Sequence, residues 1–216
     1  TKFYDETRDM IKEVMGTKQD LFLYVGSGHS AIEAVVGSIL EKNDNILVLS
    51  NGYYGERNAE ISESYGANVT KFEAEWGETF DHKKLDEYLE KNHKKFKAVI
   101  VVHTETSTGV TNPVKEISEI INKYDLVTYV DAVCSAGVSE LKMDEWNIDF
   151  CITASQKGLG APPGLAVVAV SNRGWEIIKN RDTKPTGWYL NLLTMKKFHD
   201  TQRDWQPYGI TMAVNV

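Results

Sequence analysis

Residues 148–164 read IDFCITASQKGLGAPPG, and this stretch predicts a buried strand together with the loop that follows it. The apolar run 150–154 is typical of a strand inside a sheet. The run ends at SQK (155–157), and three glycines and a Pro-Pro pair follow within seven residues. Glycine and proline at this density indicate special backbone dihedrals rather than a regular element. The sequence therefore places Lys157 at the end of a strand, next to a specialised turn.

Lys157 has two interpretations. Most lysines are solvated surface charges, and that reading applies to any single lysine. A lysine held between an apolar strand and a tight turn is expected to be partly desolvated. Desolvation lowers the pKa of the amine and makes it a usable nucleophile, for example for a Schiff base.

The composition excludes several classes of protein. The chain has 216 residues and a formal net charge of −7, with no basic cluster. This acidic balance argues against nucleic acid or an anionic membrane as the main partner. No apolar run is long enough to span a bilayer, and no signal peptide is visible. Cys134 and Cys151 lie in apolar, strand-like settings and are predicted to be reduced core residues, which favours a cytoplasmic protein.

Predicted strands alternate with predicted helices along the chain, and this order indicates βαβ units. The fold class is therefore α/β: a mostly parallel (mixed) sheet flanked by helices. In such sheets, ligands bind outside the carboxyl ends of the strands. The expected strands are 21–25, 46–50, 68–72, 98–103, 126–131, 150–154 and 165–170. Helices are expected over 1–16, 32–40, about 53–65, 81–92, from Pro113 and over 172–180, whereas 181–216 has no strong period.

A glycine-rich turn follows the first strand, where residues 26–30 read GSGHS. Glycines let the backbone approach an anion, and the start of a helix favours phosphate. The pattern Gly26-x-Gly28-x-x-Ala31 also fits a relaxed dinucleotide fingerprint. That interpretation requires an acidic residue about 20 positions later, but the next strand ends in SNG (50–52). A phosphate site is therefore favoured over a nucleotide-dependent oxidoreductase.

Three further strand ends carry polar or aromatic residues. Tyr53 and Tyr54 either pack on the core or offer a ring for stacking a planar cofactor. The loop 105–109 is rich in hydroxyls that either cap turns or reach a ligand. Asp131 either caps a turn or pairs with a cationic partner, since a buried carboxylate must be compensated. Together with Lys157 and a phosphate turn, an aromatic ring and a carboxylate indicate pyridoxal 5′-phosphate (PLP).

Five motifs in order resemble one family, the class V, fold type I PLP-dependent aminotransferases, closest to the alanine–glyoxylate / serine–pyruvate type. The resemblance extends from about Asp20 to the end of the chain. The motifs are GSGH (26–29), NGYYGER (51–57), HTETSTG (103–109), VDAV (130–133) and SQKGLGAPPG (155–164).

The resemblance implies a role for each matched residue. Lys157 would form the Schiff base with PLP and move the proton between substrate and cofactor, and Asp131 would keep the pyridine nitrogen protonated. Tyr54 would stack on the ring, Val133 would pack on its other face, and Ser107 would lie near the ring oxygen. The phosphate would be held by Ser27, Gly28, His29 and Gln156, with Thr211 of a neighbouring subunit in a homodimer.

The resemblance also implies what this chain lacks. The family has an N-terminal segment and a small C-terminal domain, whose arginine pairs with the substrate carboxylate. Residues 1–216 are therefore expected to be the PLP-binding large domain.

The implied reaction moves an amino group from a small L-amino acid, alanine or serine, to a 2-oxo acid, glyoxylate or pyruvate. The alternatives are a 2-aminoethylphosphonate–pyruvate type of aminotransferase and a fragment that binds PLP without turnover. A cysteine desulfurase is disfavoured, because the expected core positions of Cys134 and Cys151 leave no cysteine on a mobile loop.

Overall fold

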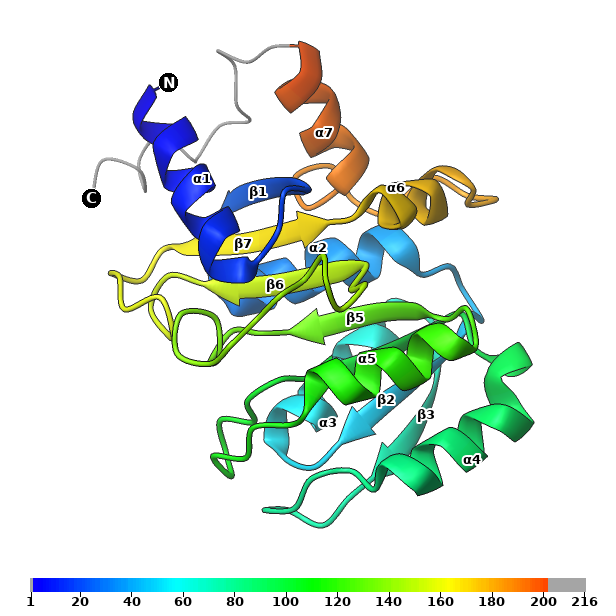
Figure 1. The fold of residues 1–216 in the computed structure, drawn as a ribbon. Coiled ribbons are helices and arrows are strands. Elements are labelled where there is room, and N and C mark those ends of the chain that lie inside the picture. Colours follow the sequence, from blue (N-terminus) through cyan, green and yellow to red (C-terminus); the bar gives the residue numbers. More distant parts are fainter. Residues whose placement is uncertain (1, 202–216) are drawn as a thin grey trace.

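A mixed β-sheet forms the centre of the fold (Figure 1). The computed structural model describes residues 2–201, and within this range the sheet has seven strands in the order β1-β7-β6-β5-β4-β2-β3. Strand β7 is antiparallel to both of its neighbours, and all other pairs are parallel. The prediction of a mostly parallel sheet is confirmed. The strands are β1 (Asp20–Val25), β2 (Asn45–Ser50), β3 (Asn68–Glu73), β4 (Ala98–Val102), β5 (Val127–Asp131), β6 (Phe150–Ala154) and β7 (Leu165–Val170).

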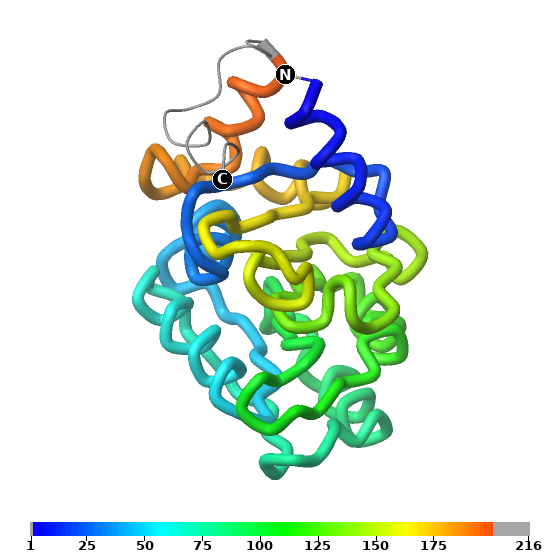
Figure 2. The backbone as a smooth tube through the Cα atoms, turned by 90° about the vertical axis from the view of Figure 1, so that its left-hand side faces the viewer, coloured from blue at the N-terminus to red at the C-terminus, as the bar shows by residue number. Residues whose placement is uncertain are grey.

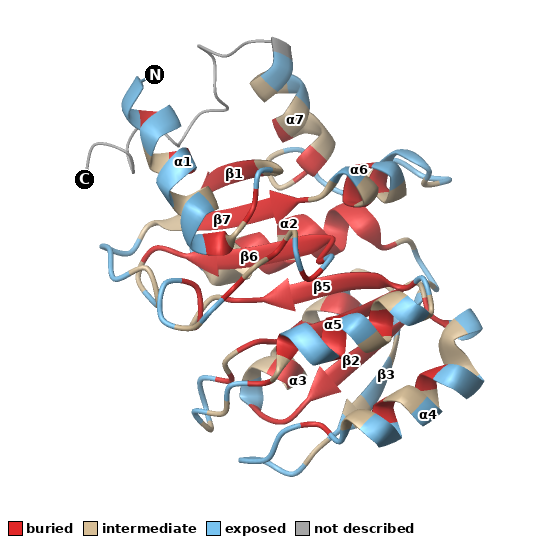
Figure 3. Ribbon diagram, in the orientation of Figure 1, coloured by how far each residue is buried: buried red, intermediate tan, exposed pale blue. Residues whose placement is uncertain are grey.

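The central strands are buried along their whole length and mostly apolar, as expected where helices cover both faces of a sheet. Every residue of β4, β5 and β6 is buried, and Figure 3 shows β5 and β6 in red. Strand β3 is different, because it lies at the edge and has exposed or half-buried residues throughout. The hydrophobic core is therefore centred on the middle strands of the sheet. These include β5, which ends at Asp131, and β6, which ends shortly before Lys157.

Helices pack on the two faces as the alternation predicted. α2 (Gly28–Ile39) and α3 (Tyr53–Ser64) pack against one face of the sheet, and α5 (Val114–Lys123), with α4 (His82–Asn92) beside it, covers the other (Figures 1 and 2). A short 3-10 helix, His93–Lys95, follows α4. The remaining helices before residue 190 are α1 (Lys2–Met15), beside β1, and α6 (Asn172–Lys179), after β7.

A further helix, α7 (Leu192–Thr201), lies in a stretch where the sequence had no strong period. It is held by a few contacts rather than by an extended apolar face. Leu192 and Met195 are buried, and the ammonium of Lys196 lies 2.7 Å from the carboxylate of Asp20. None of the helices within residues 2–201 is long and apolar enough to cross a membrane.

The strand directions determine where a ligand site can form. Strands β2, β4, β5 and β6 are parallel, and β1 points the same way because β7 reverses direction between it and β6. The segments that follow these strands therefore meet at one edge of the sheet.

Candidate active site

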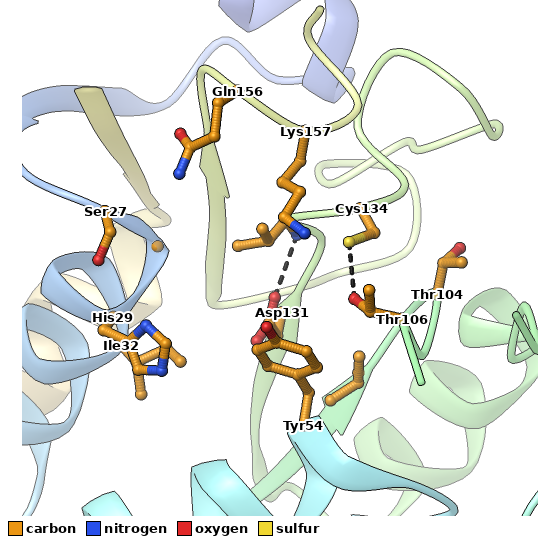
Figure 4. A pocket seen from close by; sticks show the side chains of 13 residues that line it. Ser27, His29, Ile32, Tyr54, Thr104, Thr106, Asp131, Cys134, Gln156 and Lys157 are labelled. Atoms are coloured by element: carbon orange, nitrogen blue, oxygen red, sulfur yellow. Dashed lines mark hydrogen bonds between the residues drawn. The ribbon is translucent and has the colours of Figure 1, made fainter. Parts of the chain in front are cut away.

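A pocket opens at this edge of the sheet, and it brings together most of the residues that the sequence singled out (Figure 4). The predicted residues that line it are Ser27, Gly28, His29, Tyr54, Asp131, Val133, Gln156 and Lys157. The lining also includes residues without a predicted role, namely Ile32, Val102, Thr104, Thr106 and Cys134. Thr211 lies outside the described residues.

The loop that carries Lys157 is folded back on the end of β6 by Ser155. The Ser155 hydroxyl donates to the Pro162 carbonyl oxygen (2.7 Å) and accepts from the Leu165 amide (3.2 Å). Lys157 therefore leaves the sheet edge and extends into the pocket toward Asp131 (Figure 4). Its side chain is exposed. The expectation of a partly desolvated lysine is not met, because the chain has already left the covered part of the sheet at residue 157.

Asp131 is a buried carboxylate at the end of β5, with 3% of its surface exposed. Its oxygens accept hydrogen bonds from the Val133 amide and the Asn58 side chain, each at 3.1 Å. Burial nevertheless raises the pKa of Asp131 above its ordinary value, because two neutral donors do not fully replace water. A cationic partner in the pocket would stabilise the charged form.

Asn58 connects helix α3 to Asp131, and no motif in the sequence pointed to it. The side-chain amide is fully buried and donates both to Asp131 and to the backbone carbonyl of Tyr54 (2.9 Å). A polar residue on the buried face of a helix is the signal that could have revealed it. One side chain thus holds the carboxylate and the segment that carries the aromatic ring.

The start of α2 forms a cradle suited to an anion. The Gly26 amide donates to the Gly164 carbonyl oxygen (2.9 Å), which ties the first glycine turn to the Lys157 loop. A β-carbon on Gly28 would lie 3.0 Å from a methyl group of Val133, so a larger residue here would press on that side chain. Ser27 precedes the helix but makes no side-chain cap, and Nε2 of His29 is buried without a hydrogen-bond partner among the described residues. These free donors fit a phosphate group.

Ser107 does not line the pocket, contrary to the prediction. Its hydroxyl donates to a carboxyl oxygen of Glu105 (2.8 Å) and accepts from the Tyr53 amide (2.9 Å), which turns it away from the ligand space. The neighbouring Thr106 lines the pocket instead, with its hydroxyl 2.8 Å from the sulfur of Cys134. A hydroxyl-rich loop predicts that one hydroxyl reaches the site, but the backbone path determines which one.

Glu105 is a second residue that the sequence analysis left without a role. It is fully buried, and its carboxyl group accepts hydrogen bonds from the amides of Tyr54 (3.0 Å), Gly55 (3.1 Å) and Ser107 (3.0 Å). The position of Glu105 in the sequence could have revealed it, because it lies in the loop directly after the most apolar strand. A carboxyl group that is buried there needs several hydrogen-bond donors.

The two cysteines occupy different environments. Both are free. Cys151 is fully buried in β6, as expected, and burial raises the pKa of its thiol. Cys134 is half-buried and lines the pocket, so its predicted core position was wrong. The turn after β5 directs it toward the ligand space rather than into the sheet.

The comparison with known families decides the classification. Residues 1–205 match the family described as Aminotransferase class-V. The chain belongs to the class V aminotransferases. This assignment confirms the resemblance seen in the five motifs, and it accounts for a lysine, a carboxylate and a glycine turn meeting at one edge of the sheet.

Individual class V relatives agree with the family match. An uncharacterised aminotransferase of Methanocaldococcus jannaschii is 40% identical over 98% of this chain and 55% of its own. The crystal structure of an alanine–glyoxylate aminotransferase from Nostoc sp. has a TM-score of 0.89 and 30% identity, over 95% of this chain and 54% of that one. A ureidoglycine–glyoxylate aminotransferase from Bacillus subtilis has a TM-score of 0.89 and 34% identity, over 99% and 55%. The chain thus spans about half the length of these relatives.

Proposed function

We propose that the protein is a PLP-dependent aminotransferase that moves an amino group from a small L-amino acid, alanine or serine, to glyoxylate or pyruvate. The observation that carries the proposal is that Lys157 and Asp131, from different strands, line one pocket with the free start of α2. The family supports the reaction class, and the alanine–glyoxylate relatives support the substrate class.

The pocket fits PLP at both ends of the cofactor. The start of α2, which has no side-chain cap, would hold the phosphate together with Ser27, His29 and Gln156. Asp131 would accept from the protonated pyridine nitrogen, because a buried carboxyl group with a raised pKa gains from a cationic partner. Tyr54 and Val133 line the pocket between these ends and would contact the ring.

Lys157 would act at the reacting end of the cofactor. Its Nζ would hold PLP covalently and, after substrate displaces it, carry a proton to and from the substrate α-carbon. When bound, PLP supplies the electron sink that stabilises negative charge at that carbon. Lys157 is exposed at the pocket mouth, so its amine reaches an entering substrate without a rearrangement of the sheet.

Binding of the cofactor is tested first. Purified protein mixed with PLP and reduced with borohydride should carry a pyridoxyl group on the peptide containing Lys157, detected by mass spectrometry. Lys184→Ala is the matched control, because Lys184 lies in the segment after α6 and does not line the pocket. Lys157→Ala should abolish the labelling and Lys184→Ala should leave it unchanged. Labelling that persists in Lys157→Ala would contradict the assignment.

Substrate choice is tested with a panel of donors. The protein should transfer nitrogen from alanine or serine to glyoxylate or pyruvate. Turnover of 2-aminoethylphosphonate instead would support that alternative within the family.

A cofactor-binding domain without turnover is the second candidate. It is favoured by one observation: among the described residues that line the pocket, none is an arginine that could pair with a substrate carboxylate. In this reading, residues 1–216 are the PLP-binding large domain of a longer enzyme, consistent with a chain that spans half of its relatives. Borohydride labelling without turnover would support this candidate.

We also infer that two copies of the chain associate. Phe3 and Met10 on α1 are 60% and 59% exposed, and Trp188 before α7 is 60% exposed, so apolar side chains are available for a partner. Thr211 of one copy would then complete the phosphate site of the other. Light scattering after size-exclusion chromatography should give the mass of a dimer, and a monomer mass at all concentrations would contradict the inference.

A further inference from the structure

Glu105 caps a helix that belongs to a different part of the chain. Its Oε2 accepts from the Tyr54 and Gly55 amides, which lie in the first turn of α3, and its Oε1 accepts from the amide and hydroxyl of Ser107. The residue before α3 is Gly52, which has no side chain to cap the helix. The loop after β4 therefore supplies the capping group that α3 lacks.

Gly52 makes room for this arrangement. A β-carbon on Gly52 would lie 2.4 Å from Cγ and 2.6 Å from Cδ of Glu105. Its backbone is extended, with φ of 171°, so glycine is needed here for space rather than for an unusual dihedral. The carboxyl group of Glu105 is thus packed directly against the start of α3.

Tyr54 is the residue whose position this contact determines. It is the second residue of α3 and lines the pocket, and its own amide is bonded to Glu105. Its carbonyl oxygen accepts from Asn58, so the backbone of Tyr54 is held on both sides. Because Asn58 also bonds Asp131, the backbone of Tyr54 and the carboxylate of Asp131 share one hydrogen-bond network.

We propose that Glu105 is a positioning residue for the cofactor, which acts by fixing Tyr54 over the ring-binding part of the pocket. This inference rests on the proposed function for its ligand. Glu105 does not line the pocket, so its effect on PLP must pass through α3. A purely structural cap would affect folding only, whereas a positioning residue changes the affinity for PLP in a way that depends on Tyr54.

The decisive experiment is a double-mutant cycle on PLP affinity. In Glu105→Gln the amide nitrogen cannot accept, so one pair of donors loses its partner. The dissociation constant for PLP, measured by equilibrium dialysis without substrate, should rise about tenfold, the effect of one lost strong hydrogen bond. In a Tyr54→Ala background, Glu105→Gln should change the dissociation constant for PLP by less than about twofold. The reason is that the effects of substitutions at coupled residues do not add.

Asp81→Ala is the matched control. Asp81 caps α4 through the Lys84 amide (3.0 Å) and does not line the pocket. Its loss should lower the urea midpoint and leave PLP affinity unchanged. If Glu105→Gln fails to fold, Gly52→Ala supplies the test, because it keeps the carboxyl group and displaces it from α3. It should weaken PLP binding by a similar factor.

Hydrogen exchange tests the capping hydrogen bonds of Glu105 independently of PLP binding. Without PLP, the Tyr54 and Gly55 amides should be protected in the unmodified protein and should exchange faster in Glu105→Gln or Gly52→Ala. Equal exchange, unchanged PLP affinity, or an effect of the same size in the Tyr54→Ala background would each overturn the inference. Absence of PLP binding by the unmodified protein would overturn the proposed function and, with it, the role of Glu105 toward the cofactor.

Discussion

Gly158 packs directly on the backbone of Ala136, so that a β-carbon at position 158 would lie 2.3 Å from the Ala136 carbonyl oxygen. The Gly158 amide also donates to the Val133 carbonyl oxygen (3.4 Å). Two turns from different strands are thereby pressed together. One turn carries Lys157 and the other follows Asp131, so this contact brings the two predicted catalytic residues to one pocket.

Replacement of Gly158 should separate these turns. Gly158→Ala places a methyl group against fixed backbone, and overpacking of this kind costs about 1–3 kcal/mol of unfolding free energy. Urea denaturation measures the loss, and PLP affinity should fall in the same variant. Gly160→Ala is the control: its φ of 66° makes alanine strained, but no atom lies within 4 Å of the added carbon. Its PLP affinity should be unchanged, and equal weakening in both variants would contradict the packing argument.

Stability should depend on His103 between about pH 4 and pH 6.5. His103 is buried against Trp146, and burial lowers its pKa to about 4. The unfolded chain binds a proton at His103 more readily than the folded chain does. The neutral His103 therefore favours the folded state at neutral pH, and this stabilisation is lost as the pH falls through the window. The full effect is about 3 kcal/mol.

The comparison that isolates His103 is the unfolding free energy of the unmodified protein against that of His103→Gln. Asp131 and Asp149 have raised pKa values and therefore oppose the trend, since their contribution rises as the pH falls. Their effect cancels in the difference between the two proteins. A difference that stays constant from pH 7 to pH 4 would show that His103 does not have a lowered pKa.

Asn58→Leu should disturb both Asp131 and Tyr54. It removes two buried hydrogen bonds and leaves two acceptors without this donor, which costs about 1–3 kcal/mol for each acceptor left unpaired. The pKa of Asp131 should rise further, because the Asn58 amide lowers it. Asn122→Leu is the control, because the Asn122 side chain donates to the Trp146 carbonyl oxygen (3.3 Å) and does not line the pocket. Comparable PLP affinities for the two variants would argue against the network.

Thiol reactivity should distinguish the two cysteines. Cys134 is half-buried in the pocket, whereas Cys151 is fully buried and the pKa of its thiol is raised. A chromogenic disulfide reagent should modify one thiol in the native protein and two in denaturant, and Cys134→Ser should remove the native reaction. Bound PLP should slow the modification of Cys134. Rapid reaction of Cys151 in the native protein would contradict its burial.

The local pattern was sufficient for most of the fold. Apolar runs such as 98–102 and 150–154 are buried on both faces, so their composition alone identifies them as central strands. Helix α7 was not predicted because it is held by Leu192, Met195 and the ion pair of Lys196 rather than by a periodic apolar face. Its stability comes from contacts with distant residues, which periodicity does not record.

Residues that line the pocket were predictable where a residue type is uncommon in its local setting. Lys157 and Asp131 were identified because a lysine before a glycine loop and a carboxylate ending a buried strand both need compensation. The loop 104–109 was harder, because several neighbouring hydroxyls are chemically equivalent. Only the structure shows that Thr104 and Thr106 line the pocket, whereas Ser107 bonds Glu105 instead.

The sequence by itself determined the α/β class, the family and most of the strand ends whose residues line the pocket, because these depend on local periodicity and on motifs in order. The tertiary structure alone decided which of those ends meet and how each side chain is directed. It placed Lys157 in an open pocket, brought Cys134 to the lining and set Glu105 against α3. These outcomes depend on backbone approaches between residues far apart in the chain, such as Gly158 to Ala136, and such distances are fixed by packing.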